Sequence, residues 1–138
     1  SHPEKGNSRC LARLQELLEE DLDKPRLVFV NLVDTDMLYG HRRDPLGYYL
    51  AIEEIDGELP KIIEMLGAED FLIICADHGC DPGFRGSDHT REYVPLLFYQ
   101  RGRTPVDLGI RASFADVAAT VCTMFGVQSD FGEHFLSA

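Results

Sequence analysis

Two short apolar runs, residues 27–33 and residues 71–76, each end in a polar cluster that contains aspartate and histidine. Both runs are nearly continuous and rich in β-branched residues, a pattern typical of parallel strands that are covered on both faces. Stretches of helical spacing precede and separate them. The sequence therefore predicts an α/β fold, a layered core in which helices flank a mostly parallel sheet.

The remaining elements follow from residue spacing and from helix caps. Leucines recur at helical intervals early in the chain, and Asp44 followed by Pro45 is a typical start for a long helix. Pro95 indicates that a third strand is irregular or lies at a sheet edge. We predict helices at residues 8–20, 45–66 and 113–125, a third strand at 93–99, and a loop at 77–91. Residues 1–138 are expected to form a single domain.

Charge and apolar content limit the partners of this chain. Its 24 acidic and 13 basic side chains give a formal net charge of −11. An excess of carboxylates opposes binding to nucleic-acid phosphates or anionic lipid. The sequence has no apolar run near the ~20 residues that span a bilayer, and its start is unlike a signal peptide. We expect a soluble, cytoplasmic protein with reduced cysteines and without nucleic-acid or membrane partners.

The polar clusters contain residues that suit a metal site. Asp36 and His41 follow the first run, Asp77 and His78 follow the second, and His89 lies farther along the same loop. Ligands bind at the carboxyl ends of strands in open parallel sheets. Carboxylate with imidazole suits Zn²⁺, Mn²⁺ or Fe²⁺. Five such residues are too many for one open catalytic ion and fit most of a two-metal site, which favours phosphoryl transfer.

Nearby residues have two alternative interpretations. Asp88 is predicted either to orient the imidazole of His89 or to cap the loop. The basic side chains beside the clusters either bind phosphate or pair with neighbouring carboxylates. These basic residues are Arg42, Arg43 and Arg91. Cys80 follows the second cluster, where a thiolate could approach a metal, but ligation is not favoured because oxygen and nitrogen ligands already surround that position.

Three blocks of the sequence resemble the signature blocks of the phosphopentomutase family. The blocks are residues 30–44 (VNLVDTDMLYGHRRD), 76–82 and 87–95. The family belongs to the alkaline phosphatase superfamily and interconverts ribose 1-phosphate and ribose 5-phosphate. Cofactor-independent phosphoglycerate mutases share the Ala-Asp-His-Gly block alone. The resemblance covers nearly the whole chain and implies an alkaline-phosphatase-like core fragment.

The resemblance also implies roles for individual residues. Asp36, His41 and His89 would hold one Mn²⁺, whereas Asp77 and His78 would contribute to a second, incomplete site. The family's phosphorylated threonine, an early aspartate and an inserted cap domain have no counterpart in these residues, so no catalytic nucleophile is assigned. The chain matches the carboxyl-terminal portion of the core. A sugar bisphosphate activator is implied by the family.

Three functions remain open from the sequence. The first is that the parent protein is a phosphopentomutase acting on pentose phosphate. The second is that it is a superfamily phosphatase, phosphodiesterase or phosphoglycerate mutase relative. The third is that the chain is an inactive metal-binding half-domain. For the 138 residues alone we favour the third. We expect the chain to need an amino-terminal half and, without it, to self-associate through exposed apolar faces.

Overall fold

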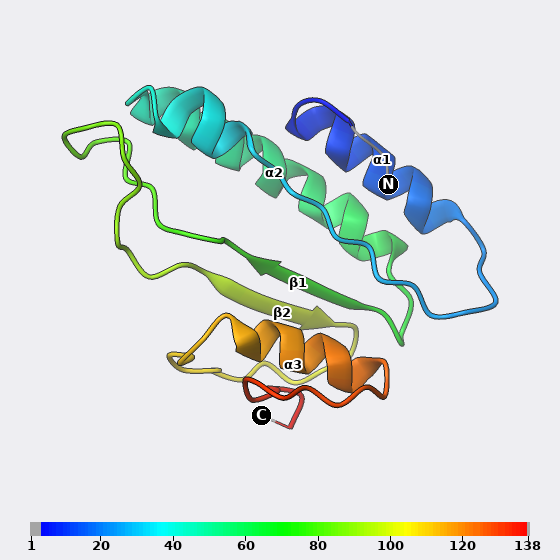
Figure 1. Cartoon of the computed structure of the whole chain (residues 1–138). Helices are drawn as coiled ribbons and strands as arrows, with labels where there is room; N and C mark the ends of the chain where they lie inside the picture. Colours follow the sequence, from blue (N-terminus) through cyan, green and yellow to red (C-terminus); the bar gives the residue numbers. More distant parts are fainter. Residues whose placement is uncertain (1–3, 138) are drawn as a thin grey trace. The chain divides into compact units, whose positions relative to one another are not determined.

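The computed structural model describes residues 4–137, which form two compact units, Ser1–Gly102 and Arg103–Ala138. The first unit contains helices at its start and a small sheet at its end (Figure 1). The second unit contains one helix. The elements are α1 (Asn7–Glu19), the π-helix η1 (Thr35–Gly40), α2 (Pro45–Met65), β1 (Phe71–Cys75), β2 (Leu96–Gln100) and α3 (Ala115–Met124).

The three predicted α-helices are confirmed, with boundaries that shift by a few residues. Asp44 caps α2 because its carboxylate accepts a hydrogen bond from the Gly47 backbone N–H at 2.9 Å. Helix α1 lies beside α2 (Figure 1) and buries Leu11. Gln15 joins the two helices by donating to Glu58 at 2.6 Å and accepting from Lys61 at 2.5 Å. This network fixes the register of the helix pair.

The sheet differs from the prediction of a mostly parallel one. Strands β1 and β2 pair antiparallel, with Phe71 opposite Gln100 and Cys75 opposite Leu96. The loop between them folds back on itself, and an isolated bridge between Gly79 and Thr90 continues the pairing into it. A chain that reverses in this way returns antiparallel, whereas a parallel return needs a crossover connection.

The predicted strand at residues 27–33 is not formed. Residues 27–32 make no backbone hydrogen bond within residues 4–137. Side-chain exposure alternates as in a strand, with Leu27 60% and Phe29 86% exposed while Val28 and Val30 are half-buried. A strand needs a partner for its backbone groups. The apolar pattern predicted the alternating exposure correctly but could not show that a partner strand exists.

Side chains at both ends of the first unit tie its elements together. Asn7, at the start of α1, receives a bond from the Asp34 backbone N–H at 3.2 Å and donates its own N–H to the Asp34 carboxylate at 2.8 Å. Arg101, which follows β2, donates to the Ile63 and Leu66 carbonyls at the end of α2. These bonds satisfy helix-terminal groups and fix the helices to the segments that carry the site.

Asp116 organises the second unit. Its buried carboxylate accepts from Arg111 Nε at 2.8 Å and from the Glu133 backbone N–H at 3.0 Å. One turn farther along α3, the Thr120 hydroxyl donates to the Asp116 carbonyl and accepts from the Phe135 backbone N–H. The carboxyl-terminal segment is thus attached to α3 by hydrogen bonds around one buried acid.

We expect Asp116→Ala to lower the free energy of unfolding of the second unit by about 3 kcal/mol, because it removes the acceptor of Arg111 Nε and of the Glu133 backbone N–H. Denaturant unfolding of the whole chain, followed by amide exchange of α3, measures this loss. Asp130→Ala, which changes an exposed aspartate in the same unit, is the matched control. Equal stability of both variants would contradict the assignment of Asp116 as the organising residue.

No helix within residues 4–137 is both long enough and apolar enough to cross a membrane.

Candidate metal centre

Asp36 lies on η1, which follows the segment of residues 27–33, and His41 is the C-cap of η1. The His41 backbone N–H donates to the Asp36 carbonyl at 3.1 Å. This bond joins residues five positions apart, whereas an α-helix joins residues four positions apart. Wider turns of this kind are frequent at functional sites. Here the turn allows the two side chains to meet, with Nε2 of His41 3.4 Å from Oδ2 of Asp36.

His89 completes this group from a different part of the chain. Its Nε2 lies 3.5 Å from Oδ1 of Asp36 and 3.1 Å from Nε2 of His41. Two imidazole nitrogens bound to one tetrahedral ion are separated by roughly 3.3 Å, given metal–nitrogen distances near 2.0–2.1 Å. The spacing of the histidines therefore matches that of two ligands of one cation.

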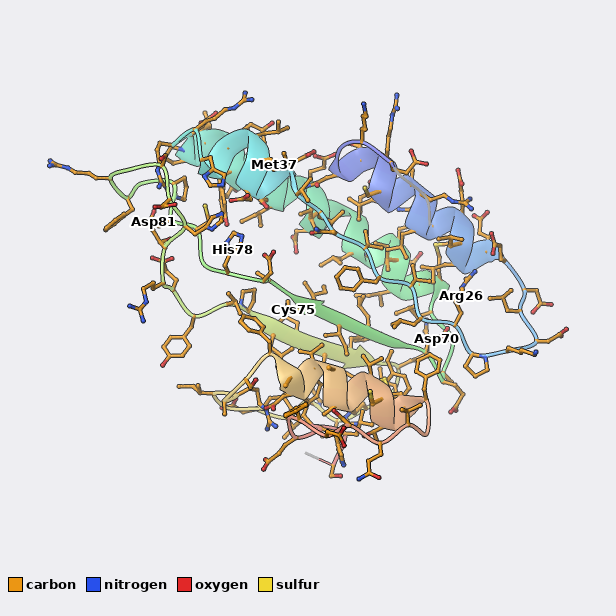
Figure 2. All side chains as sticks on the ribbon, viewed as in Figure 1. Arg26, Met37, Asp70, Cys75, His78 and Asp81 are labelled. Carbon is orange, nitrogen blue, oxygen red and sulfur yellow. The ribbon has the colours of Figure 1, made fainter. Side chains whose placement is uncertain are left out.

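The second polar cluster lies next to the first. The His78 ring stacks on the His89 ring with 3.7 Å between centroids, and ligand atoms of Asp36, His78 and His89 fall within 4.8 Å of one another. Figure 2 shows His78 just past Cys75, the last residue of β1. Asp77 lies at the edge of the group, with its side chain 82% exposed and Oδ1 3.6 Å from His78 Nε2.

Backbone carbonyls determine which nitrogen of two histidines carries the proton. His41 Nδ1 lies 2.6 Å from the Ser87 carbonyl, and His78 Nδ1 lies 3.1 Å from the Gly79 carbonyl. A carbonyl oxygen only accepts, so each Nδ1 bears the hydrogen and each neutral ring presents a lone pair at Nε2. Metal-ligating histidines are commonly oriented by such outer hydrogen bonds.

The donor set fits a divalent cation. Oδ1 of Asp36 is buried and has no hydrogen-bond partner among residues 4–137, although buried carboxylate oxygens are rarely left unpaired. The lone pairs of His41 and the imidazole of His89 face the same carboxylate. A cation at this point would satisfy the orphan oxygen and both nitrogens, so these residues can hold a metal ion.

Cys80 lies beside this centre, as its place after the second polar cluster indicated, and contacts Asp36. Its thiol contacts the Asp36 carboxylate, and burial, followed by the charge of Asp36, raises the pKa of the thiol. The proton is therefore retained, and Cys80 faces Asp36 as a hydrogen-bond donor rather than as a thiolate ligand. All four cysteines are free thiols.

Gly40 leaves the space that Cys80 occupies. A Cβ at this position would lie 2.5 Å from the Cys80 Sγ and 3.2 Å from the Thr35 carbonyl. We expect Gly40→Ala to displace the thiol and the adjacent Asp36, weakening Mn²⁺ binding about tenfold, as the loss of an outer contact does. Calorimetric titration measures the affinity. Gly40→Ala with Cys80→Ala should recover most of it, and a double variant no better than Gly40→Ala would contradict this explanation.

The flanking residues make different contacts from those predicted. Arg42 and Arg91 are exposed and have no hydrogen bond or ion pair among the described residues. The carboxylate of Asp88 likewise has no partner there, and its backbone carbonyl accepts from Arg43 at 2.6 Å. Arg43 does not pair with the neighbouring Asp44. Sequence analysis missed its contacts because all three of its acceptors are backbone carbonyls, which no residue pattern reveals.

Comparison with known proteins identifies the class to which this site belongs. The family model described as the Metalloenzyme superfamily matches residues 3–129, and the chain belongs to that superfamily. Its relatives there are phosphopentomutases, as the signature blocks indicated. The chain is 56% identical to a phosphopentomutase of Anaeromyxobacter sp. (strain K) over 132 residues, which are 96% of this chain and 34% of that protein.

Two further relatives give the same result. The phosphopentomutase of Symbiobacterium thermophilum is 53% identical over 133 residues, 95% of this chain and 33% of the relative. That of Pseudoalteromonas translucida is 47% identical over 136 residues, 98% of this chain and 33% of the relative. The chain therefore spans about a third of the length of the curated relatives that it matches.

Proposed function

We propose that this chain provides metal ligands of a phosphopentomutase that interconverts ribose 1-phosphate and ribose 5-phosphate by two-metal phosphoryl transfer. The observation that carries the proposal is the convergence of His41 and His89 on the Asp36 carboxylate, one oxygen of which is buried without a partner. About half of the residues are identical to those of phosphopentomutases over most of the chain.

The five candidate ligands divide into two groups. Asp36, His41 and His89 would hold one Mn²⁺, and the exposed Asp77 with His78 would contribute to a second. When bound, such a metal pair stabilises the charge that develops on a transferred phosphoryl group. His41 and His78 keep a proton at Nδ1 on a backbone carbonyl, so that Nε2 stays available, and Asp36 supplies the negative charge of the first group.

The phosphorylated residue of the reaction is proposed to come from outside these 138 residues. Thr90 is the threonine next to His89, but its hydroxyl accepts from the Asp81 backbone N–H at 2.6 Å and donates to Glu92. These bonds join the two ends of the loop and occupy the hydroxyl. An amino-terminal half would supply the nucleophile, the missing ligands and the contacts to the pentose phosphate and to a sugar bisphosphate activator.

Reconstitution tests this proposal. A coupled assay would follow conversion of ribose 1-phosphate to ribose 5-phosphate with Mn²⁺ and a sugar bisphosphate, using this chain, the amino-terminal two thirds of the Anaeromyxobacter relative, or both. We expect activity only from the mixture, and none when the chain carries Asp36→Asn. Turnover by this chain alone, or no turnover by the mixture despite complex formation, would contradict the proposal.

The same assay distinguishes the alternatives. Release of inorganic phosphate without isomerisation would identify a phosphatase, and turnover of phosphoglycerate instead of pentose phosphate would identify a relative of cofactor-independent phosphoglycerate mutase. Metal binding without complex formation would favour an inactive half-domain. Self-association is proposed to occur through the exposed apolar residues of the segment 27–33, including Phe29, and sedimentation at rising concentration would measure it.

A further inference from the structure

Arg43 attaches the loop that leads to His89 to the segment that carries His41. Its guanidinium donates to three backbone carbonyls of that loop: Nε to Gly86, Nη1 to Asp81 at 2.8 Å and Nη2 to Asp88 at 2.6 Å. His41, two residues before Arg43, donates to the carbonyl of Ser87, which lies between Gly86 and Asp88 in the chain. One short segment therefore holds four carbonyls of residues 81–88.

The loop makes few other long-range contacts. Asp81 accepts hydrogen bonds from the N–H groups of Gly83 and Phe84, which are local to the turn. The bond from the Asp81 backbone to Thr90 closes the base of the loop. Within the described residues, the bonds from Arg43 and His41 are the hydrogen bonds that connect residues 82–88 to the rest of the first unit. These bonds hold the chain before His89, while the bonds of Thr90 to Gly79 and Asp81 hold the chain after it.

The geometry of Arg43 suits this task better than that of any other cationic side chain. Arginine presents a planar fork with donors in fixed directions, whereas lysine carries one compact ammonium group on a flexible stem. Among the described residues, Arg43 is also the one non-glycine residue in the left-handed region, with φ 54°. A strained backbone conformation persists where the surrounding contacts determine it, and here the three carbonyls provide those contacts.

We propose that Arg43 is a positioning residue of the candidate metal centre: by binding the carbonyls of residues 81–88 it holds His89 opposite His41 and Asp36. The inference rests on the proposed metal-binding function, but it concerns a residue that touches none of the ligand atoms. The positive charge of Arg43 is used on backbone oxygens, so it is not available as a phosphate ligand, which was one of the alternatives drawn from the sequence.

The test compares Arg43→Lys with Arg42→Lys in the full 138-residue chain. Arg42 is the adjacent arginine and is exposed and unpartnered among the described residues, so it controls for charge and for the effect of substitution. Co²⁺ serves as the probe because its visible spectrum reports coordination geometry. We expect Arg43→Lys to weaken Co²⁺ binding at least tenfold and to change the spectrum of the bound ion, with Arg42→Lys behaving as the wild type.

Amide exchange without metal provides an independent readout. Arg43→Lys should speed exchange at the hydrogen-bonded amides of Gly83, Phe84 and Thr90, whereas the amides of α1 and α2 should not change. Equal Co²⁺ affinity and equal exchange in the two variants would overturn the role of Arg43 and leave the metal centre standing. Absence of Co²⁺ binding by the wild type would overturn the proposed function, and the exchange data would then decide on Arg43 alone.

Discussion

Replacing Asp36 by asparagine should abolish tight metal binding by this chain. Both oxygens of the carboxylate face imidazole nitrogens, Oδ2 toward His41 and Oδ1 toward His89. Asparagine keeps the shape but removes the negative charge and puts an N–H₂ group where one oxygen was. The amide nitrogen cannot bind a cation and instead donates to an imidazole. We expect the affinity for Mn²⁺ to fall by more than about 100-fold, beyond the effect of losing an outer contact.

Calorimetric titration with Mn²⁺, supported by electron paramagnetic resonance of the free ion, would measure this affinity. Asp130→Asn makes the same chemical change at an exposed aspartate of the other unit and should not alter the affinity. One binding event per chain is expected for the wild type, because the second group contains only Asp77 and His78. Unchanged Mn²⁺ affinity in Asp36→Asn would show that these atoms do not form the site.

Replacing Gly132 by alanine should unfold much of the second unit. Gly132 has φ +78°, and a Cβ there would overlap the carbonyl carbon and oxygen of Ala115, the first residue of α3. Backbone atoms at a helix start cannot move aside as a side-chain end can. The left-handed conformation costs an alanine roughly 1–2 kcal/mol, and the overlap adds a cost typical of overpacking, so we expect about 3 kcal/mol or more in total.

Gly126→Ala separates these two costs. Gly126 also has a positive φ, +66°, but a Cβ at this position meets no atom within 4 Å. The Gly126→Ala variant should therefore lose only the stability that the left-handed conformation costs. Denaturant unfolding by circular dichroism, with amide exchange of α3, would compare the two variants in the whole chain. A similar loss of unfolding free energy in the two variants would mean that Gly132 and Ala115 are not in close contact in solution.

The helices were predictable because their signals are local. Asp44 and Pro45 mark the start of α2 through groups that lie within one turn of each other. The sheet was not predictable in the same way. Residues 27–33 have a strand's composition and a strand's alternation of exposure, yet pairing depends on a distant partner that composition cannot reveal. The direction of β2 relative to β1 is likewise set by the loop between them.

The candidate site was predictable in its members and less so in its arrangement. Asp36, His41, His78 and His89 were proposed from their place beside apolar runs, and the structure brings them together. Their assignment as ligands stays a prediction. The contact of Cys80 with Asp36 and the bonds of Arg43 were missed, because they depend on backbone shape at η1 and in the 77–91 loop.

We expect the backbone of residues 27–32, which makes no hydrogen bond within residues 4–137, to couple metal binding to assembly. This segment leads directly into η1 and Asp36, and its N–H and C=O groups, unpaired among the described residues, are those that an added strand would use. If a partner segment orders residues 27–32, it also fixes the start of η1, so metal and partner segment favour the same conformation. Coupling of this kind is reciprocal. We therefore expect Mn²⁺ to tighten binding of the partner segment by the same factor by which that segment tightens binding of Mn²⁺.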